Sequence, residues 1–412
     1  MDLVHERAAG IDISKRDAKV CVRVPGDKPG EFTSSVSTWP ATTNGILELR
    51  DFLERKHVTT VVMEATGVFW KPFYYLLEET LDVMLVNARQ AKNLPGRKTD
   101  VSDSMWLAQL GAHGLLRPSF VPPEPIRELR DLTRTRQVLV RDRTREIQRL
   151  AKFLESTGIK LSNVATDLMG ASSRSMLEAL IAGEHDPNTL AALARGKMRV
   201  KIPELSEALL GRFNAHDAFM VRAHLTQIDA FTAQIDLFTE RIEEVMLPFR
   251  AIRDVLTTIP GVSTRVADTI IAETGGNMSV FPTSRHLASW AGVCPSSNES
   301  AGRVKSTKIQ PGNKYLKEML GVAAISASRT KNTYLNALYH RLIPRIGNLK
   351  AIVALEHSIL TSVYEMLTTG QPYEDLGPDH FTRLNPERAL ARHLRHIRNL
   401  GYNVTLTPIE AA

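Results

Sequence analysis

Cysteine is nearly missing from this chain of 412 residues, which has only Cys21 and Cys294. The two are far apart and no Cys/His spacing resembles a zinc site, so neither a disulfide framework nor a zinc centre is indicated. A reducing cytoplasm is the simplest interpretation. Residues 1–10 lack the apolar segment of a signal peptide, and no uncharged apolar run approaches the ~18–20 residues that span a bilayer. We therefore expect a soluble, cytoplasmic protein with no membrane partner.

Positive charge and apolar side chains are well represented. Lysine and arginine outnumber aspartate and glutamate by 52 to 45, which gives a net charge of +7. A basic surplus favours polyanionic partners. Apolar residues make up 43% of the chain, enough to build cores and to exclude global disorder. At roughly 100–200 residues per domain, the length predicts two or three domains.

Residues 1–120 have the pattern of an α/β domain. Residues 8–14 and 18–24 are strand-like and flank a polar turn, which predicts a β-hairpin. Strands are also expected at 58–63 and 82–86, and helices at 46–56, 70–80 and 99–115, the last with Thr99 as its N-cap. Alternating strands and helices predict a mixed sheet. The proline-rich segment 118–125 is a natural domain edge.

Residues 121–252 are predicted to be helical. Residues 126–158 form an arginine-dense helix, which is either an ordinary solvated helix with i,i+3 ion pairs or a helix that contacts phosphates. Residues 216–246 have a 3.5-residue apolar repeat, typical of a coiled coil or of a helix hairpin within one chain.

Residues 253–412 are expected to form a mainly helical domain. Residues 256–275 read as helix, tight turn and helix. The pattern resembles the helix-hairpin-helix DNA-binding module, with Ser263 where that module has a second glycine, and an ordinary helical hairpin is the alternative. Further helices include one at residues 353–367.

Four acidic residues of the first domain are candidates for metal ligands. Asp12 lies within a strand, Glu64 ends one, and Asp100 and Asp103 stand three apart at the start of a predicted helix. A buried charge in a strand is costly unless it is paired or binds metal. Each residue alone has a structural alternative, such as a helix cap or a turn. Together they could supply the oxygen ligands of a divalent-ion site for phosphoryl transfer.

At these positions the sequence resembles the transposases of insertion-sequence family 110. The motifs GIDISK around Asp12, MEATG around Glu64, and KTDVSDSMWLA around Asp100 and Asp103 are similar to the DEDD motif of that family. Downstream, residues 259–262, 287–305, 311–320, 355–360 and 373–381 resemble its later blocks in the same order. The resemblance implies a RuvC-like, RNase H-type N-terminal domain that binds divalent metal, taken as Mg²⁺ rather than Mn²⁺.

The resemblance also implies a second catalytic group. Residues 298–302 (NESAG) match the serine motif of the family, so Ser300 would attack a DNA phosphate and form a covalent link, beside carboxylates that another subunit can supply. Ser296 and Ser297 stay open as alternatives on residue chemistry alone. The family is associated with a structured guide RNA that pairs with donor and target DNA. The partners implied are double-stranded DNA at element ends and target, this guide RNA, and further copies of the chain in a dimer or tetramer.

Basic side chains are candidates for contacts with the nucleic-acid backbone, and association with the nucleoid is expected. They lie in the arginine-dense helix and in the loop after Ser300: Arg134, Arg141, Arg145, Arg149, Arg303, Lys305, Lys308 and Lys314.

Three functions compete at this point. The first is an RNA-guided transposase or recombinase that uses Ser300 with the metal-binding carboxylates. The second is a metal-dependent, structure-selective nuclease of the Holliday-junction resolvase type, in which water attacks. The third is a non-catalytic DNA-binding protein. All four carboxylates are present, which argues against the third, and the long C-terminal region argues against a minimal resolvase.

Overall fold

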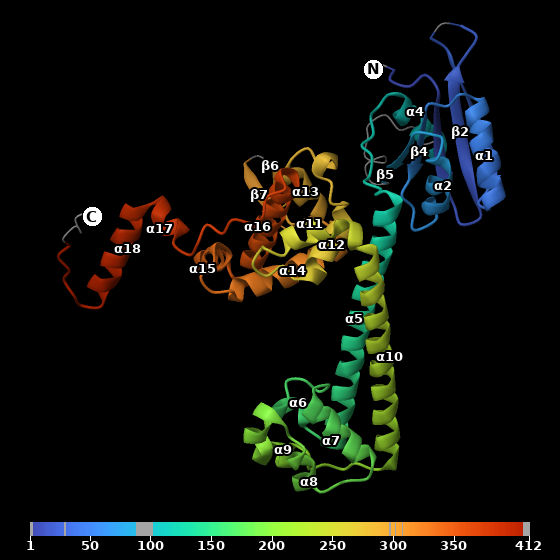
Figure 1. The fold of residues 1–412 in the computed structure, drawn as a ribbon. Helices are drawn as coiled ribbons and strands as arrows, with labels where there is room; N and C mark the ends of the chain where they lie inside the picture. The colour runs from blue at the N-terminus through green and yellow to red at the C-terminus, as the bar shows by residue number, and fades with distance from the viewer. Residues whose placement is uncertain are drawn as a thin grey trace. The chain divides into compact units, whose positions relative to one another are not determined.

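The computed structural model describes residues 3–28, 30–87, 102–295, 298–300, 302–306 and 308–406, with the side chains of 298–300 and 304 left out. The chain divides into two compact units (Figure 1). The first comprises Met1–Val121 and the second Pro122–Ala412.

The first unit is built on a five-stranded mixed sheet with the strand order β3-β2-β1-β4-β5. The strands β1, β2 and β3 pair antiparallel, whereas β1 and β4, and β4 and β5, pair in parallel. The predicted hairpin of the first two strands is confirmed. The strands are β1 (Ala8–Ile13), β2 (Asp17–Pro25), β3 (Phe32–Pro40), β4 (Thr60–Glu64) and β5 (Val83–Val86).

Helices cover both faces of this sheet. One face packs Ile11, Val20 and Met63 against apolar residues of α1 (Thr43–Arg55) and α2 (Trp70–Leu77). On the other face, Val62 and Val86 join a smaller core with α4 (Asp103–Ala112). The sheet is therefore the middle layer of three, and α4 alone of the named helices shares the core of the second face.

The second unit contains two long helices that pack against each other. These are α5 (Glu124–Thr157), which ends at Gly158 in the left-handed conformation, and α10 (Ala215–Val245). The apolar repeat of α10 is buried, with Val221, Leu225 and Ile235 among its enclosed side chains. Its seam therefore packs within the same chain, against α5, although the helices between α5 and α10 mean that the two do not form a simple hairpin.

The connection between these long helices forms a small helical subdomain with its own core, to which Leu150 and Leu225 contribute. Its elements are α6 (Leu161–Val164), α7 (Ala171–Ile181), α8 (Pro187–Ala192), η1 (Gly196–Lys201) and α9 (Ile202–Ala208).

The other ends of α5 and α10 join a larger core formed by the helices that follow. Among these, α12 is the second helix predicted within residues 256–275, whereas the helix before the turn, α11, ends at Leu256 and so lies almost entirely before the predicted segment. The elements are η2 (Leu247–Phe249), α11 (Arg250–Leu256), α12 (Thr264–Thr274), η3 (Met278–Val280), α13 (Ser284–Ala291), α14 (Lys314–Arg329), α15 (Tyr334–Ile346) and α16 (Asn348–Thr369).

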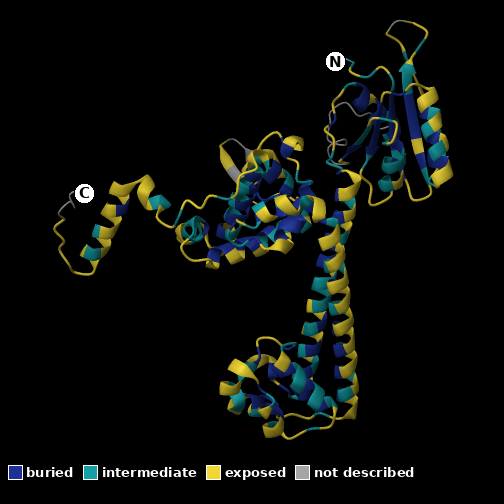
Figure 2. Cartoon of the chain, in the orientation of Figure 1, coloured by how far each residue is buried: buried dark blue, intermediate teal, exposed yellow. Residues whose placement is uncertain are grey.

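Two parts extend from this helical core. A short hairpin, β6 (Asn298–Ser300) and β7 (Arg303–Ser306), lies between α13 and α14, and α17 (His380–Leu384) and α18 (Pro386–Asn399) follow α16. Buried residues fill the cores, whereas α18 is largely exposed (Figure 2). Within the described ranges, no helix has both the length and the apolar character needed to cross a bilayer.

Candidate active site

Asp12 and Glu64 emerge from one face of the sheet on neighbouring strands. In the parallel pairing of β1 and β4, Gly10 lies opposite Val62, and Ile11 lies opposite Met63. Asp12 and Glu64 are each two residues beyond the first pair, and side chains alternate along a strand. They therefore share the face of Gly10 and Val62, which is the face covered by α4.

The N-terminal end of α4 lies toward the end of β1 that carries Asp12. A Cβ atom on Gly10 would lie 2.1 Å from the Ser104 carbonyl oxygen, so strand and helix touch there. Before the start of β1, the Val4 backbone N–H donates to the carbonyl oxygen of Ala112, the last residue of α4, at 2.9 Å. The helix thus runs antiparallel to β1, and its first residue, Asp103, is directed toward the carboxylate end of the strand.

Ser102 caps α4, which corrects the predicted N-cap at Thr99. Its hydroxyl accepts a hydrogen bond from the Met105 backbone N–H at 3.4 Å. Serine and threonine are both good caps, and Ser102 stands three residues after Thr99. Asp103 follows the cap directly and occupies the first helical turn. Asp100 and Thr99 lie outside the described residues.

The chemistry of this donor set suits a hard divalent ion, because carboxylate oxygens are the ligands that such ions prefer. Asp12, Glu64 and Asp103 each interact with other groups of the chain. Within the described ranges, no three His, Cys, Asp or Glu side chains form a group that could hold a metal ion. The fourth predicted ligand, Asp100, is outside those ranges.

The predicted nucleophile lies at the end of a β-ribbon, the segment 292–312. Ser300 ends β6 and is paired in register with Arg303 of β7; its side chain is outside the described part of the structure. The base of the ribbon is closed by the bridge between Pro295 and Ile309. Below it, a Cβ on Gly312 would lie 2.3 Å from the Ala291 carbonyl carbon, so the two strands of the ribbon leave the helical core side by side.

A buried glutamate, Glu273 of α12, fixes the helix that follows the ribbon. Its side chain is fully enclosed and accepts two hydrogen bonds from the Arg134 guanidinium, both at 2.7 Å. The Asn313 amide donates to the same carboxylate at 2.6 Å, while the Asn313 oxygen caps α14. Arg130 donates to the Glu273 carbonyl oxygen at 2.7 Å. Sequence reasoning missed this centre, because Glu273 carries no motif and its partners are distant in the chain.

A second buried ion cluster joins α5, α11 and α12. Asp268 is 1% exposed and lies 3.2 Å from a guanidinium nitrogen of Arg136. Burial raises the pKa of Asp268 despite the nearby Arg136 and Arg253. Arg253 in turn makes two hydrogen bonds to Glu243, at 2.8 and 2.9 Å. These groups hold helices together, and two of them, Glu243 and Arg253, also line a surface hollow.

The basic side chains predicted to contact nucleic acid fall into two groups. Those of α5 are engaged by carboxylates: besides Arg134, the pairs are Arg141–Glu318 at 3.7 Å, Arg145–Asp142 at 3.1 Å and Arg149–Glu146 at 2.6 Å. Those of the ribbon, Arg303, Lys305 and Lys308, are exposed. The Lys314 ammonium lies 4.8 Å from the Tyr315 ring centroid. Contact of either group with nucleic acid stays a prediction.

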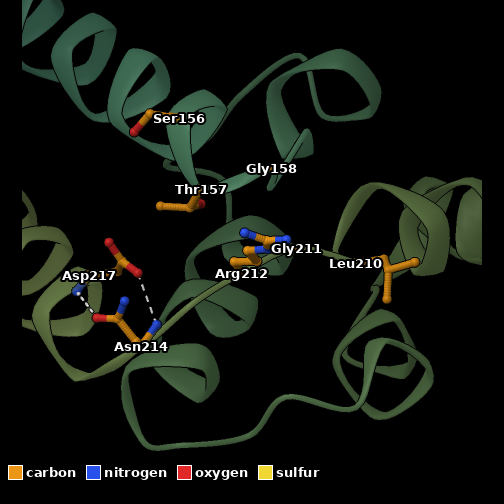
Figure 3. A pocket seen from close by; sticks show the side chains of 8 residues that line it. All are labelled: Ser156, Thr157, Gly158, Leu210, Gly211, Arg212, Asn214 and Asp217. Atoms are coloured by element: carbon orange, nitrogen blue, oxygen red, sulfur yellow. Dashed lines mark hydrogen bonds between the residues drawn. The ribbon is translucent and has the colours of Figure 1, made fainter.

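A surface hollow where α5 ends and α10 begins has a structural explanation (Figure 3). It is lined by residues 156–158, 210–212, 214 and 217. Asn214 caps α10 by accepting hydrogen bonds from the His216 and Asp217 backbones, and Asp217 accepts one from the Asn214 backbone in return. The one carboxylate at the hollow is therefore engaged in helix capping.

Family models match the two segments of the chain that contain the predicted site residues. A transposase family model matches residues 9–159, which contain the four carboxylates. The model of the transposase IS116/IS110/IS902 family matches residues 253–340, which contain Ser300.

Two curated relatives are similar over longer segments. The 43.6 kDa uncharacterized protein of insertion element IS110 from Streptomyces coelicolor is 27% identical over 198 residues, which are 47% of this chain and 43% of that protein. A protein of Sinorhizobium fredii, provisionally named a transposase, is 24% identical over 338 residues, which are 79% of this chain and 77% of the relative.

Proposed function

The chain belongs to the IS116/IS110/IS902 family of transposases, and from this we propose that it cuts and rejoins DNA through Ser300, assisted by Asp12, Glu64, Asp100 and Asp103. The observation that carries the proposal is the shared position of Asp12 and Glu64. Both leave the same face of the sheet on adjacent strands, on the side covered by α4, whose first residue is Asp103.

The fold of the first unit supports this assignment. A sheet with the order β3-β2-β1-β4-β5, three antiparallel strands followed by two parallel ones, is compatible with the RNase H-like, RuvC-type fold. Acidic residues on the central strand and at the end of its parallel neighbour lie where open α/β sheets place their sites. We propose that Asp12, Glu64, Asp100 and Asp103 hold Mg²⁺ there. When bound, such ions neutralise charge on the phosphoryl group and on the attacking and leaving oxygens.

The serine step conserves the energy of the phosphodiester. The Ser300 hydroxyl oxygen forms a bond to a DNA phosphorus, and the bond from that phosphorus to a deoxyribose oxygen breaks. The released oxygen takes up a proton, which balances the proton lost by the serine. Because the phosphorus remains esterified to the protein, attack by a second deoxyribose hydroxyl can rejoin a strand without ATP.

The partners proposed for this chemistry follow from the family and from the charge of the ribbon. Double-stranded DNA is the substrate, and exposed Arg303, Lys305 and Lys308 supply positive charge next to Ser300. A structured guide RNA would select the sequence, as in other RNA-guided systems. Because two duplexes must be cut and joined, we also propose a dimer or tetramer, acting at the nucleoid.

A suicide DNA substrate with a nicked strand tests the nucleophile. We expect wild-type protein to form a covalent protein–DNA adduct that resists denaturation, and Ser300→Ala to abolish it, because no hydroxyl remains to bond phosphorus. Asp12→Asn should abolish both adduct and cleavage. The matched control is Ser297→Ala in the same segment, which should retain the adduct.

The opposite pattern would identify a different enzyme. If Ser300→Ala still cleaves and leaves free DNA ends, water is the attacking group and the protein is a metal-dependent nuclease of the resolvase type. If the adduct is lost in Ser297→Ala and kept in Ser300→Ala, the serine assignment is wrong.

A further inference from the structure

Helix α18 is a basic helix that contributes little to the fold. Ala389 is its one buried side chain, and Leu394 and Ile397 are half-buried. The helix carries four arginines against a single glutamate, Glu387, and all four arginines are exposed: Arg388, Arg392, Arg395 and Arg398.

The preceding helix ties this segment to the helical core. The ring of Phe381 in α17 is stacked on Tyr334 of α15, with centroids 5.4 Å apart, and His380 meets the same tyrosine ring edge-on at 5.2 Å. The Arg341 guanidinium lies 4.3 Å from the Phe381 ring centroid. The base of α18 is therefore attached, while most of the helix itself is exposed (Figure 2).

The arginines of α18 differ from those of α5 in how they are paired. On α5, Arg134, Arg145 and Arg149 each meet a carboxylate within 4 Å. Among the residues that the structure describes, none of the four α18 arginines makes such a pair. Carboxylates therefore neutralise these arginines of α5, whereas within the described residues they do not neutralise those of α18.

The four side chains form an elongated basic surface. Arg388, Arg392 and Arg395 follow i, i+4, i+7 spacing and so share one helical face, with Arg398 one turn further on. At about 1.5 Å of rise per residue, the row extends about 15 Å along the axis. B-form DNA carries one phosphate charge per about 1.7 Å of axis, so several phosphates lie within reach of this row.

We propose that α18 binds the phosphate backbone of double-stranded DNA, with this arginine row as the contact surface. The inference rests on the proposed function, which makes DNA the substrate. It adds a contact surface outside residues 9–159 and 253–340, the segments that the family models match.

Duplex DNA fits this surface better than other polyanions. A helix enters the major groove of B-form DNA, which is about 12 Å wide, whereas the major groove of A-form RNA is too narrow and deep. Membrane-surface helices bury an apolar face rich in Leu, Phe or Trp. Helix α18 has no Phe, Tyr or Trp, and Leu394 and Ile397 are half-buried, so Leu390 is its one exposed large apolar side chain.

The test compares charge-matched variants of the full-length protein on a duplex oligonucleotide at several salt concentrations. The first variant replaces the α18 arginines by glutamine (R388Q, R392Q, R395Q and R398Q). The control removes the same charge from exposed positions of the small helical subdomain (R195Q, K197Q, R199Q and R212Q). A third variant keeps the charge of α18 (R388K, R392K, R395K and R398K). Circular dichroism checks that all of them fold.

We expect the glutamine variant of α18 to bind duplex DNA at least about tenfold more weakly at 0.1 M salt. Its plot of log K against log salt should be less steep by about 0.9 for each phosphate that the variant leaves without a cationic partner. The control should keep the wild-type slope, and the lysine variant should regain most of it, because ammonium groups also neutralise phosphates.

Three results would overturn the inference. These are an unchanged slope in the α18 variant, an equal loss of affinity in the control, and a loss confined to duplex RNA or to anionic vesicles used as competing ligands. Absence of DNA binding by the wild-type protein would instead refute the proposed function, so the two failures are distinguishable.

Discussion

The carboxyl group of Glu356 is enclosed where α14 and α16 meet. The residue is 5% exposed, and its Oε2 atom has no hydrogen-bond partner among the described residues. A Cβ atom on Gly321 would lie 3.4 Å from its other oxygen. Burial raises the pKa of Glu356 to about 7, although Lys317 opposes that change. Below about pH 7 the folded protein therefore favours the neutral form of Glu356.

This burial makes stability depend on pH. In the unfolded chain Glu356 ionises near its ordinary pKa of 4.5, but in the folded protein only near 7. The free energy of unfolding is therefore unaffected by this group below pH 4.5. It decreases as the pH rises from 4.5 to 7, by about 3 kcal/mol at most. The side chain in Glu356→Gln cannot ionise. The stability of this variant relative to wild type should therefore increase by up to that amount between pH 4.5 and pH 8. Urea denaturation at both pH values measures the difference.

An exposed glutamate on the same helix supplies the control for this measurement. Glu365→Gln should leave the pH dependence unchanged, because Glu365 is in solvent. If Glu356→Gln and wild type differ by the same free energy at pH 4.5 and pH 8, the carboxyl group of Glu356 ionises normally in the folded protein and its burial does not set the pH dependence.

The strands that carry the candidate ligands Asp12 and Glu64 could be predicted, whereas contacts made by tertiary packing could not. Asp12 lies within an apolar run and Glu64 lies at the end of another, so the sequence predicted both strands. The partners of Glu273 lie about 140 residues earlier in the chain, at Arg130 and Arg134, and 40 residues later, at Asn313. No local sequence pattern predicts contacts between residues so far apart in the chain.

Among the elements, β1 and α4 make the contact on which the position of the carboxylates depends. Gly10 allows it, because a Cβ there would lie 2.1 Å from the Ser104 carbonyl oxygen and 2.4 Å from the Ala108 backbone nitrogen. Both atoms belong to the helix backbone and cannot move independently. Any side chain at position 10 would therefore push α4, with Asp103, away from Asp12.

Gly10→Ala tests this contact. We expect a destabilisation of about 1–3 kcal/mol from overpacking, together with loss of DNA cleavage beyond what the lower stability explains. Thermal unfolding and cleavage under conditions where the variant is folded measure the two effects. Gly26→Ala is the control in the same unit, since its Cβ would meet the side chain of exposed Glu31 at 3.2 Å. Wild-type stability and cleavage in Gly10→Ala would show that α4 is not held in this way.

Elements with a regular apolar or amphipathic pattern were predictable, whereas β3, which lacks one, was not. The strands β1, β2, β4 and β5 and the helices α5 and α10 all have such patterns, and the structure contains them. The edge strand β3 escaped prediction because its residues are mostly serine, threonine and exposed. Its backbone pairing with β2 forms it, which no side-chain pattern reports.

At the scale of the whole molecule, the chain divides after Val121. The first unit has its own apolar cores on both faces of the sheet, formed by residues such as Ile11 and Leu49 on one side and Leu107 and Leu110 on the other. A unit of this size with its own core has what independent folding requires.

We therefore expect a fragment of residues 1–121 to unfold cooperatively and to gain stability from Mg²⁺. Ions that bind only the folded state raise its melting temperature as their concentration rises. Asp12→Asn should reduce that rise, whereas Asp51→Asn, at an exposed position of α1, should not. Calorimetry with and without Mg²⁺ provides the measurement. A fragment that lacks a cooperative transition, or one stabilised equally in both variants, would contradict the expectation.

The ribbon of residues 292–312 leaves and re-enters the helical core at adjacent points, where Gly292 and Gly312 pack closely. A segment closed at its base in this way can gain or lose paired residues without moving the helices on either side. Its length sets how far position 300 extends beyond the helices. The length of the ribbon can therefore vary among proteins while the helices beneath it stay the same.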